Sequence, residues 1–220
     1  MNPGDNPIQP QRLLLCTDLD RTLLPNGAQP ESAQARASFS RLVAHPQVTL
    51  VYVTGRHRQL VEQAIEQYHL PRPDYVIADV GSTVYQLSAS DWGYQQNWEQ
   101  FIAADWQGKS AEQLQSLFGD IETIRLQEQS KQNSHKLSYY VSLKFDQQAI
   151  MSMMQDRLKQ QSIAANLIWS IDEQQGIGLL DVLPASAGKR QAIEFLMQQL
   201  GYAVAETVFA GDSGNDLDVL

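Results

Sequence analysis

The sequence predicts an α/β fold, in which a doubly wound parallel sheet is interrupted by an inserted α+β domain. Two observations carry this prediction. Short apolar runs alternate with amphipathic helical segments near both ends of the chain, and a segment of different texture lies between them. With 220 residues, 43% of them hydrophobic, the chain is long enough for one such core and a smaller insert.

The first part of the core begins with an apolar run that leads directly into acidic residues. Such a run is typical of a strand buried on both faces of a parallel sheet. The expected elements are a strand at 12–17, a helix at 31–44, a strand at 48–53, a helix at 59–68 and a strand at 74–78. Ligands of such sheets bind beyond the carboxyl ends of the strands, so chemistry is expected just after Thr17 and Val53.

Residues 87–183 are expected to form the inserted domain. Apolar and polar residues alternate over 137–143, which predicts a strand with one solvent-facing side and therefore an antiparallel sheet. The other expected elements of the insert are helices at 98–105, 111–118 and 147–160 and strands at 166–171 and 178–183. The core resumes with a helix at 189–200 and a strand at 207–210, so it comprises 11–86 and 184–220, after a disordered leader at 1–10.

Composition excludes several classes of partner and location. The formal net charge of −9 repels phosphate backbones and anionic lipid, so neither nucleic acid nor a membrane surface is expected to bind. No apolar run reaches the length of a membrane span, and the first residues lack the pattern of a signal peptide. The single cysteine, Cys16, has no partner for an internal disulfide. We therefore expect a cytoplasmic protein, a monomer or weak dimer.

Asp18 and Asp20 directly follow the first expected strand and point to the same side of the chain. Two carboxylates this close repel each other unless a cation lies between them or one holds a proton. The pair is therefore typical of a metal or acid/base site, although a loop of solvated aspartates would have the same sequence.

Three further segments sit at strand ends or helix starts. Thr54-Gly55-Arg56 follows the second strand, where a hydroxyl and exposed backbone N–H groups can bind an anion, or simply form a turn. Lys189 begins a helix, where a cation is disfavoured unless an anion accompanies it; a solvated lysine is the alternative. Asp212 and Asp216 belong to a glycine-containing stretch after the last strand, and carboxylates suit Mg²⁺.

These four segments, in this order, resemble the haloacid dehalogenase (HAD) superfamily. The resemblance implies a Rossmann-like core and phosphoryl transfer through an aspartyl-phosphate. It assigns Asp18 as the nucleophile and Asp20 as the general acid and base. The phosphate would be held by Thr54, Gly55, Lys189 and Asn215. Mg²⁺ would be held by Asp18, Asp212 and Asp216, with Asp20 contributing its backbone carbonyl.

The insert resembles the cap domain of HAD enzymes that act on small phosphorylated metabolites, and local matches in both core and insert resemble the sucrose-phosphate phosphatase-like branch of this superfamily. The matching segments are Tyr52 to Arg56, Pro73 to Tyr75, Val80 to Tyr85, Lys136 to Tyr139 and Leu180 to Pro184. In that light the candidate substrate contacts are Arg56, Lys136, Tyr139 and Asp181. For Tyr139 the alternative is packing in the cap core, and for Lys136 a solvated strand end.

The resemblance implies a Mg²⁺-dependent phosphatase that hydrolyses a sugar phosphate such as sucrose 6-phosphate. The alternatives are a phosphosugar mutase and a truncated, non-catalytic remnant that binds sugar phosphates. Two departures bear on this choice. Arg21 stands where many HAD enzymes have glycine or asparagine, and the C-terminal core elements that relatives carry after the acidic motif are expected to be missing here.

Overall fold

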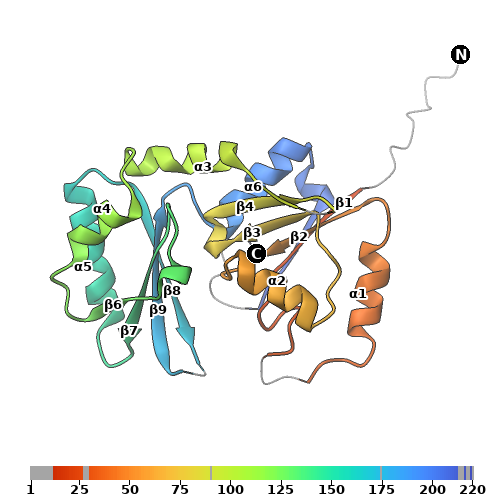
Figure 1. Cartoon of the computed structure of the whole chain (residues 1–220), viewed down its shortest axis with the longest axis horizontal. Helices are drawn as coiled ribbons and strands as arrows, with labels where there is room; N and C mark the ends of the chain where they lie inside the picture. Colours follow the sequence, from red (N-terminus) through yellow and green to blue (C-terminus); the bar gives the residue numbers. More distant parts are fainter. Residues whose placement is uncertain are drawn as a thin grey trace, which may run out of the picture.

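The computed structural model describes residues 12–26, 30–89, 91–173, 175–212, 216 and 219, so the leader expected at 1–10 lies outside the described residues. Within them the molecule has two lobes, each built on its own sheet (Figure 1). We call residues 104–184 the cap and the remaining described residues the core. No helix of the described ranges is long and apolar enough to cross a bilayer.

The core sheet has six strands in the order β10-β1-β2-β3-β4-β5. The first four of these strands are parallel. β4 is antiparallel to β3, and β5 is antiparallel to β4. The strands are β1 (Leu13–Thr17), β2 (Val48–Val53), β3 (Tyr75–Ala78), β4 (Thr83–Leu87), β5 (Trp92–Tyr94) and β10 (Thr207–Ala210). The helices are α1 (Ala35–Val43), α2 (Arg58–Gln67), α3 (Gln96–Ala103) and α6 (Lys189–Leu200). The predicted α/β fold class is confirmed.

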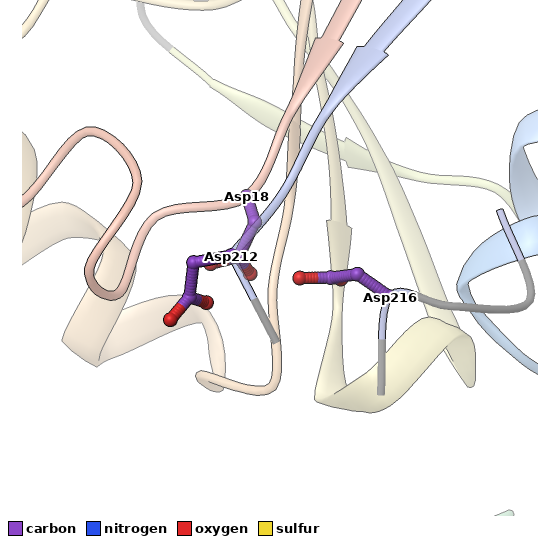
Figure 2. A group of neighbouring side chains, drawn as sticks. All are labelled: Asp18, Asp212 and Asp216. Carbon is purple, nitrogen blue, oxygen red and sulfur yellow. The ribbon is translucent and has the colours of Figure 1, made fainter. Parts of the chain in front are cut away.

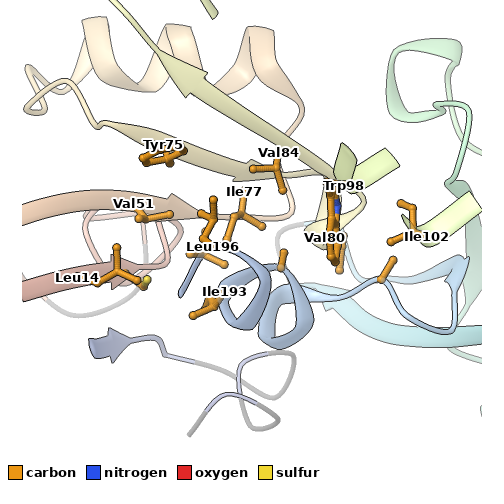
Figure 3. Close-up of a cluster of buried hydrophobic side chains, with 14 of the residues drawn as sticks. Leu14, Val51, Tyr75, Ile77, Val80, Val84, Trp98, Ile102, Ile193 and Leu196 are labelled. Carbon is orange, nitrogen blue, oxygen red and sulfur yellow. The ribbon is translucent and has the colours of Figure 1, made fainter. Parts of the chain in front are cut away.

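The core sheet is buried on both faces because successive side chains of a strand point to opposite sides. Leu14 and Cys16 of β1 pack in a cluster with Ile193 and Leu196 of α6 (Figure 3). Leu15, on the opposite face, packs in the cluster that includes residues of α2. Because β10, β1, β2 and β3 are parallel, their carboxyl ends lie at one common edge of the sheet. The loops that follow these strands carry the predicted site residues.

The cap sheet has four antiparallel strands in the order β6-β7-β9-β8. Its elements are α4 (Ala111–Gln115), β6 (Ile124–Leu126), β7 (Leu137–Ser142), α5 (Gln147–Gln160), β8 (Ala165–Asp172) and β9 (Ile177–Pro184). Leu137 and Val141 of β7 pack with Met154 and Leu158 of α5 in one apolar cluster. The cap sheet thus has one helix-covered face, and the intervening residues of β7 lie on the other.

The cap begins later along the chain than residue 87, where the sequence analysis placed it. β5 pairs with β4 in the core sheet, and Tyr85 packs edge-on against Trp92, with ring centroids 5.4 Å apart. Trp98 and Ile102 of α3 are buried in the core cluster shown in Figure 3. A Trp-rich texture is therefore shared by the last core hairpin, α3 and the cap, which is why the boundary was misplaced.

Candidate active site

Three carboxylates meet at the carboxyl ends of β1 and β10 (Figure 2). Asp18 follows β1 and is held there by its N–H group, which donates to the carbonyl of Ala210 at 2.8 Å. Asp212 follows β10 on the solvent side, and Asp216 points back toward both from a buried position. One oxygen from each of Asp18, Asp212 and Asp216 lies within 4.8 Å of the others.

Lys189 joins two of these carboxylates from the first turn of α6. Its Nζ donates to Asp18 Oδ1 at 2.9 Å and to Asp216 Oδ1 at 2.6 Å. All three side chains are buried, the lysine being 3% exposed. Burial lowers the pKa of Lys189, but the two carboxylates outweigh this effect and the pKa is raised. The cation at this helix start therefore has its anionic partners inside the protein.

The pKa of Asp18 is raised to about 6, mainly by burial, while the nearby Lys189 ammonium acts in the opposite direction. Asp216 and Asp20 add repulsion. A single lysine does not offset the negative charge of this group, and an added cation would favour the ionised form of Asp18. The electrostatics therefore fit a site that takes up a positive ion.

The donor set also fits a divalent metal. Asp216 Oδ2 is buried and has no hydrogen-bond partner within the described part of the chain. It approaches Gly211 so closely that a Cβ there would lie 2.6 Å from this oxygen. Hard carboxylate oxygens are the ligands that Mg²⁺ prefers, usually with several waters retained. Asp18, Asp212 and Asp216 are thus the residues that could hold it.

The Asp20 carboxylate is not part of this group and is bound by Arg56 and Asn26 instead. Arg56 donates to it from Nη2 at 2.6 Å and from Nε at 2.9 Å, and Asn26 Nδ2 donates at 2.7 Å. Burial raises the pKa of Asp20, but the hydrogen bonds and charge of Arg56, together with Asn26 and Lys189, outweigh burial and the pKa is lowered. Asp20 is therefore ionised in this arrangement, and Arg56, a predicted substrate contact, is occupied by it.

Thr54 is fully buried at the end of β2, on the same sheet edge as Asp18. Its N–H group donates to the carbonyl of Ile77 at 2.8 Å, and its hydroxyl accepts from the N–H group of Arg56 at 3.2 Å. Gly55 follows it in the same loop. Asn215, the remaining predicted phosphate contact, lies outside the described residues.

The predicted substrate contacts of the cap separate in the structure. Asp181 of β9 accepts a hydrogen bond from Ser138 at 2.5 Å, on the face of the cap sheet opposite α5. Tyr139 lies on the helix-covered face, 3% exposed and edge-on to Phe118. Its alternation with Ser138 along β7 sends the ring into the cap core, so the prediction of a sugar contact at Tyr139 is corrected to packing.

Lys136 is buried and ends on Asp79, a carboxylate that the sequence analysis did not single out. Lys136 Nζ donates to Asp79 Oδ1 at 3.3 Å, and both side chains are less than a tenth exposed. The available signal was an acidic residue directly after the apolar run of β3, at the same sheet edge as Asp18. Lys136 is thus not the solvated strand end that was the alternative to a sugar contact.

Arg21 connects the core loop after β1 with the cap. Its guanidinium lies 3.2 Å from Glu173, beside the β8–β9 turn, and 3.6 Å from Asp212. These groups are solvent-exposed, so the ion pairs contribute little stability. Their position shows that the cap hairpin reaches the loop that carries the paired aspartates.

Comparison with known proteins agrees with this geometry. The family model of sucrose-6F-phosphate phosphohydrolase matches residues 11–220. A putative HAD-like hydrolase of Nitrosococcus oceani is 50% identical over 96% of this chain and 57% of its own length. Sucrose-phosphatase 2 of Nicotiana tabacum is 30% identical over 94% of this chain and 47% of its own length.

The chain spans about half the length of these curated relatives. Among solved structures, the sucrose-phosphatase of Synechocystis sp., in complex with sucrose and phosphate, has a TM-score of 0.78 at 27% identity. That similarity covers 94% of this chain and 78% of the other. The described chain therefore belongs to the sucrose-6F-phosphate phosphohydrolase family, within the HAD superfamily.

Proposed function

We propose that this chain carries the active site of a Mg²⁺-dependent phosphatase that hydrolyses a sugar phosphate through an aspartyl-phosphate on Asp18. One observation carries the proposal: Lys189 bridges the buried carboxylates of Asp18 and Asp216, with Asp212 beside them, at the edge where the parallel strands end. A carboxylate nucleophile placed beside a lysine and a metal-binding carboxylate group is suited to accept a phosphoryl group.

In the proposed first step an Asp18 oxygen attacks phosphorus, and the bond from phosphorus to the sugar oxygen breaks. Asp20 gives a proton to that leaving oxygen. In the second step Asp20 takes a proton from water as the water oxygen attacks phosphorus, which releases inorganic phosphate and restores the Asp18 carboxylate. Because the pKa of Asp18 is about 6, the nucleophile is mainly ionised at neutral pH.

Asp20 can begin this cycle only after it takes up a proton. In the structure Arg56 holds it ionised. We propose that Arg56 leaves Asp20 for the anionic substrate, which removes the main interaction that lowers the pKa of Asp20. Asp20 then regains the proton affinity that an acid needs.

Lys189, Thr54 and Gly55 bind the phosphoryl oxygens in this proposal. The hydroxyl of Thr54 and the backbone of Gly55 lie on the loop after β2, and Lys189 approaches from α6. Asp18, Asp212 and Asp216 would hold Mg²⁺, with the backbone carbonyl of Asp20. When bound, Mg²⁺ supplies positive charge that offsets the phosphate and lets an anionic nucleophile approach.

The substrate class is proposed from the relatives. Their names include sucrose-phosphatases and a mannosylfructose-phosphate phosphatase of Agrobacterium fabrum, which is 28% identical over 78% of its own length. We therefore place sucrose 6-phosphate first, followed by other glycosyl phosphates. The face of the cap sheet opposite α5, where Asp181 lies, carries polar groups of the kind that bind a sugar.

The test is release of inorganic phosphate from sucrose 6-phosphate and from other hexose phosphates, with Mg²⁺ and with EDTA. We expect Mg²⁺-dependent release, abolished in Asp18→Asn and retained in Asp156→Asn, which changes an exposed carboxylate of α5. Phosphoryl transfer between sugar positions without release would show a mutase. Binding of sugar phosphates without turnover would show a binding protein, and either result would overturn the proposal.

A further inference from the structure

A strained backbone segment lies between the two predicted phosphate-binding elements. Asp79, Val80 and Gly81 all have positive φ, at 53°, 61° and 94°. Valine is branched at Cβ and is rarely found in the left-handed region, so its surroundings must hold it there. We call Asp79–Gly81 the left-handed segment.

One side of this segment is bonded to the loop that follows β2. The N–H group of Asp79 donates to the carbonyl of Arg56 at 3.0 Å, and that of Val80 donates to the carbonyl of Thr54 at 3.1 Å. The loop that carries the Thr54 hydroxyl is therefore positioned by the backbone of the left-handed segment.

The other side packs against the start of α6. A Cβ on Gly81 would lie 2.2 Å from the carbonyl carbon of Gly188 and 2.7 Å from the backbone nitrogen of Lys189. The carbonyl of Gly81 also accepts a hydrogen bond from Trp98 Nε1 at 3.1 Å. The left-handed segment thus separates the Thr54 loop from Lys189 and sets their spacing.

The cap contacts this segment, and the two residues that follow it, through polar side chains. Asp79 Oδ1 accepts from Lys136 at 3.3 Å, and Asp79 Oδ2 accepts from Thr83 at 3.3 Å. Asn133, in the same cap loop as Lys136, donates to the hydroxyls of Ser82 at 3.0 Å and Thr83 at 3.3 Å. Separating a buried ion pair leaves uncompensated charges and costs free energy, so the Lys136–Asp79 pair opposes separation of the two lobes.

We propose that Asp79 is a positioning residue, which ties Lys136 of the cap to the backbone that spaces Thr54 and Lys189. The position of the cap is thereby transmitted to the phosphate site. Asp79 makes this link without contacting the reacting atoms, since its carboxylate is occupied by Lys136 and Thr83.

The first test measures amide hydrogen exchange and needs no catalytic activity. In Lys136→Met, exchange of the Asp79 and Val80 amides, which are bonded to the loop after β2, is expected to rise about tenfold. The matched control is Lys144→Met, an exposed cap lysine at the other end of β7. Exchange at both amides equal to the control in a folded Lys136→Met protein would overturn the proposal.

Two further variants keep this test decisive. Lys136→Arg retains a cation and is expected to restore much of the protection that Lys136→Met loses. If Lys136→Met does not fold, Asn133→Ala can be used instead. It removes the hydrogen bonds from the cap to Ser82 and Thr83 without leaving a buried charge. It is expected to raise exchange of the Val80 amide severalfold, and an unchanged rate would count against the proposal.

The second test is kinetic and rests on the proposed function. In Asp79→Asn the substrate must itself restore the alignment of cap and core, so KM for a sugar phosphate is expected to rise about tenfold while kcat changes much less. A fall in kcat with unchanged KM would contradict a positioning role. If the wild-type chain hydrolyses no sugar phosphate, the proposed function fails, but the exchange experiment still decides the role of Asp79.

Discussion

Replacing Lys189 by methionine removes the cation that two buried carboxylates share. The side chain keeps its approximate length but loses the hydrogen bonds to Asp18 at 2.9 Å and to Asp216 at 2.6 Å. Each contact corresponds to about 6 kcal/mol of Coulomb attraction at an effective dielectric constant of about 20, before desolvation is counted. Breaking a buried ion pair in this way costs a net of about 3–5 kcal/mol.

The pH dependence of this loss has a definite sign. The pKa of Lys189 is raised in the folded protein. The contribution of Lys189 to the free energy of unfolding is therefore complete at pH 8, and it is lost only when the pH rises through this raised pKa. Asp18 already has a pKa of about 6, and loss of the lysine raises it further. At pH 5 Asp18 is then protonated, less charge is buried, and the cost of the substitution is smaller.

Urea unfolding followed by circular dichroism, in EDTA at pH 8 and pH 5, measures this difference. Lys144→Met, at an exposed position of the cap, is the control and is expected to change the free energy of unfolding by less than about 0.5 kcal/mol. Added Mg²⁺ should stabilise Lys189→Met more at pH 8 than at pH 5, since protons compete with metals for carboxylates. A cost at pH 8 no larger than that of the control would refute the electrostatic reasoning.

Three further predictions follow from burial and backbone geometry. Tyr139→Phe removes a buried hydroxyl with no hydrogen-bond partner among the described residues, so the free energy of unfolding should stay the same or rise by about 1 kcal/mol. A decrease in the free energy of unfolding by more than about 1 kcal/mol, or a raised KM, would show that the hydroxyl makes a hydrogen bond in the protein or to the substrate. Cys16 is fully buried and burial raises the pKa of its thiol to about 12, so a disulfide reagent should modify it only in urea; rapid reaction of the native protein would contradict this. Gly81→Ala should cost about 3 kcal/mol or more in thermal or urea unfolding, because its Cβ would meet Gly188 at 2.2 Å at a φ of 94°. Gly108→Ala, at a φ of 74° with open space around it, is the matched control and should cost about 1 kcal/mol; equal costs would show that packing at residue 81 is loose.

Elements with strong periodicity and clear boundaries were predictable from sequence. α6 begins at Lys189, just after a glycine, and both it and β10 have the predicted bounds. The parallel strands could be recognised because they are continuous apolar runs, which is what burial on both faces requires. The acidic residues after β1 and β10 could be placed at one sheet edge for the same topological reason.

The hairpin of β4 and β5 was not predicted. Its strands are short, and their side chains are partly exposed around Tyr85, so neither a buried run nor a clean alternation marks them. Their order in the sheet depends on pairing, which single-strand patterns do not specify.

The choice between a sugar contact and core packing at Tyr139 could not be made from sequence for a related reason. Alternation along β7 shows that Ser138 and Tyr139 lie on opposite faces, but it does not tell which face α5 covers. That choice is made by the packing of the whole cap, where Tyr139 contacts Phe118.

Two interactions at the site were beyond sequence reasoning because they join distant segments. Arg56 reaches Asp20 across two neighbouring strand ends, and Lys136 reaches Asp79 across the boundary between cap and core. Each partner has an ordinary role when considered alone. Only the folded chain shows that both pairs exist.

The most direct test of the proposed chemistry is to trap the phosphoryl group on the protein. The chain is mixed with Mg²⁺ and sucrose 6-phosphate, quenched in acid and reduced with borohydride, which converts an acyl-phosphate to an alcohol that mass spectrometry can locate. The account predicts modification of Asp18, dependent on Mg²⁺ and absent from Asp20. Phosphate release without modification of Asp18, or with modification of another carboxylate, would contradict it.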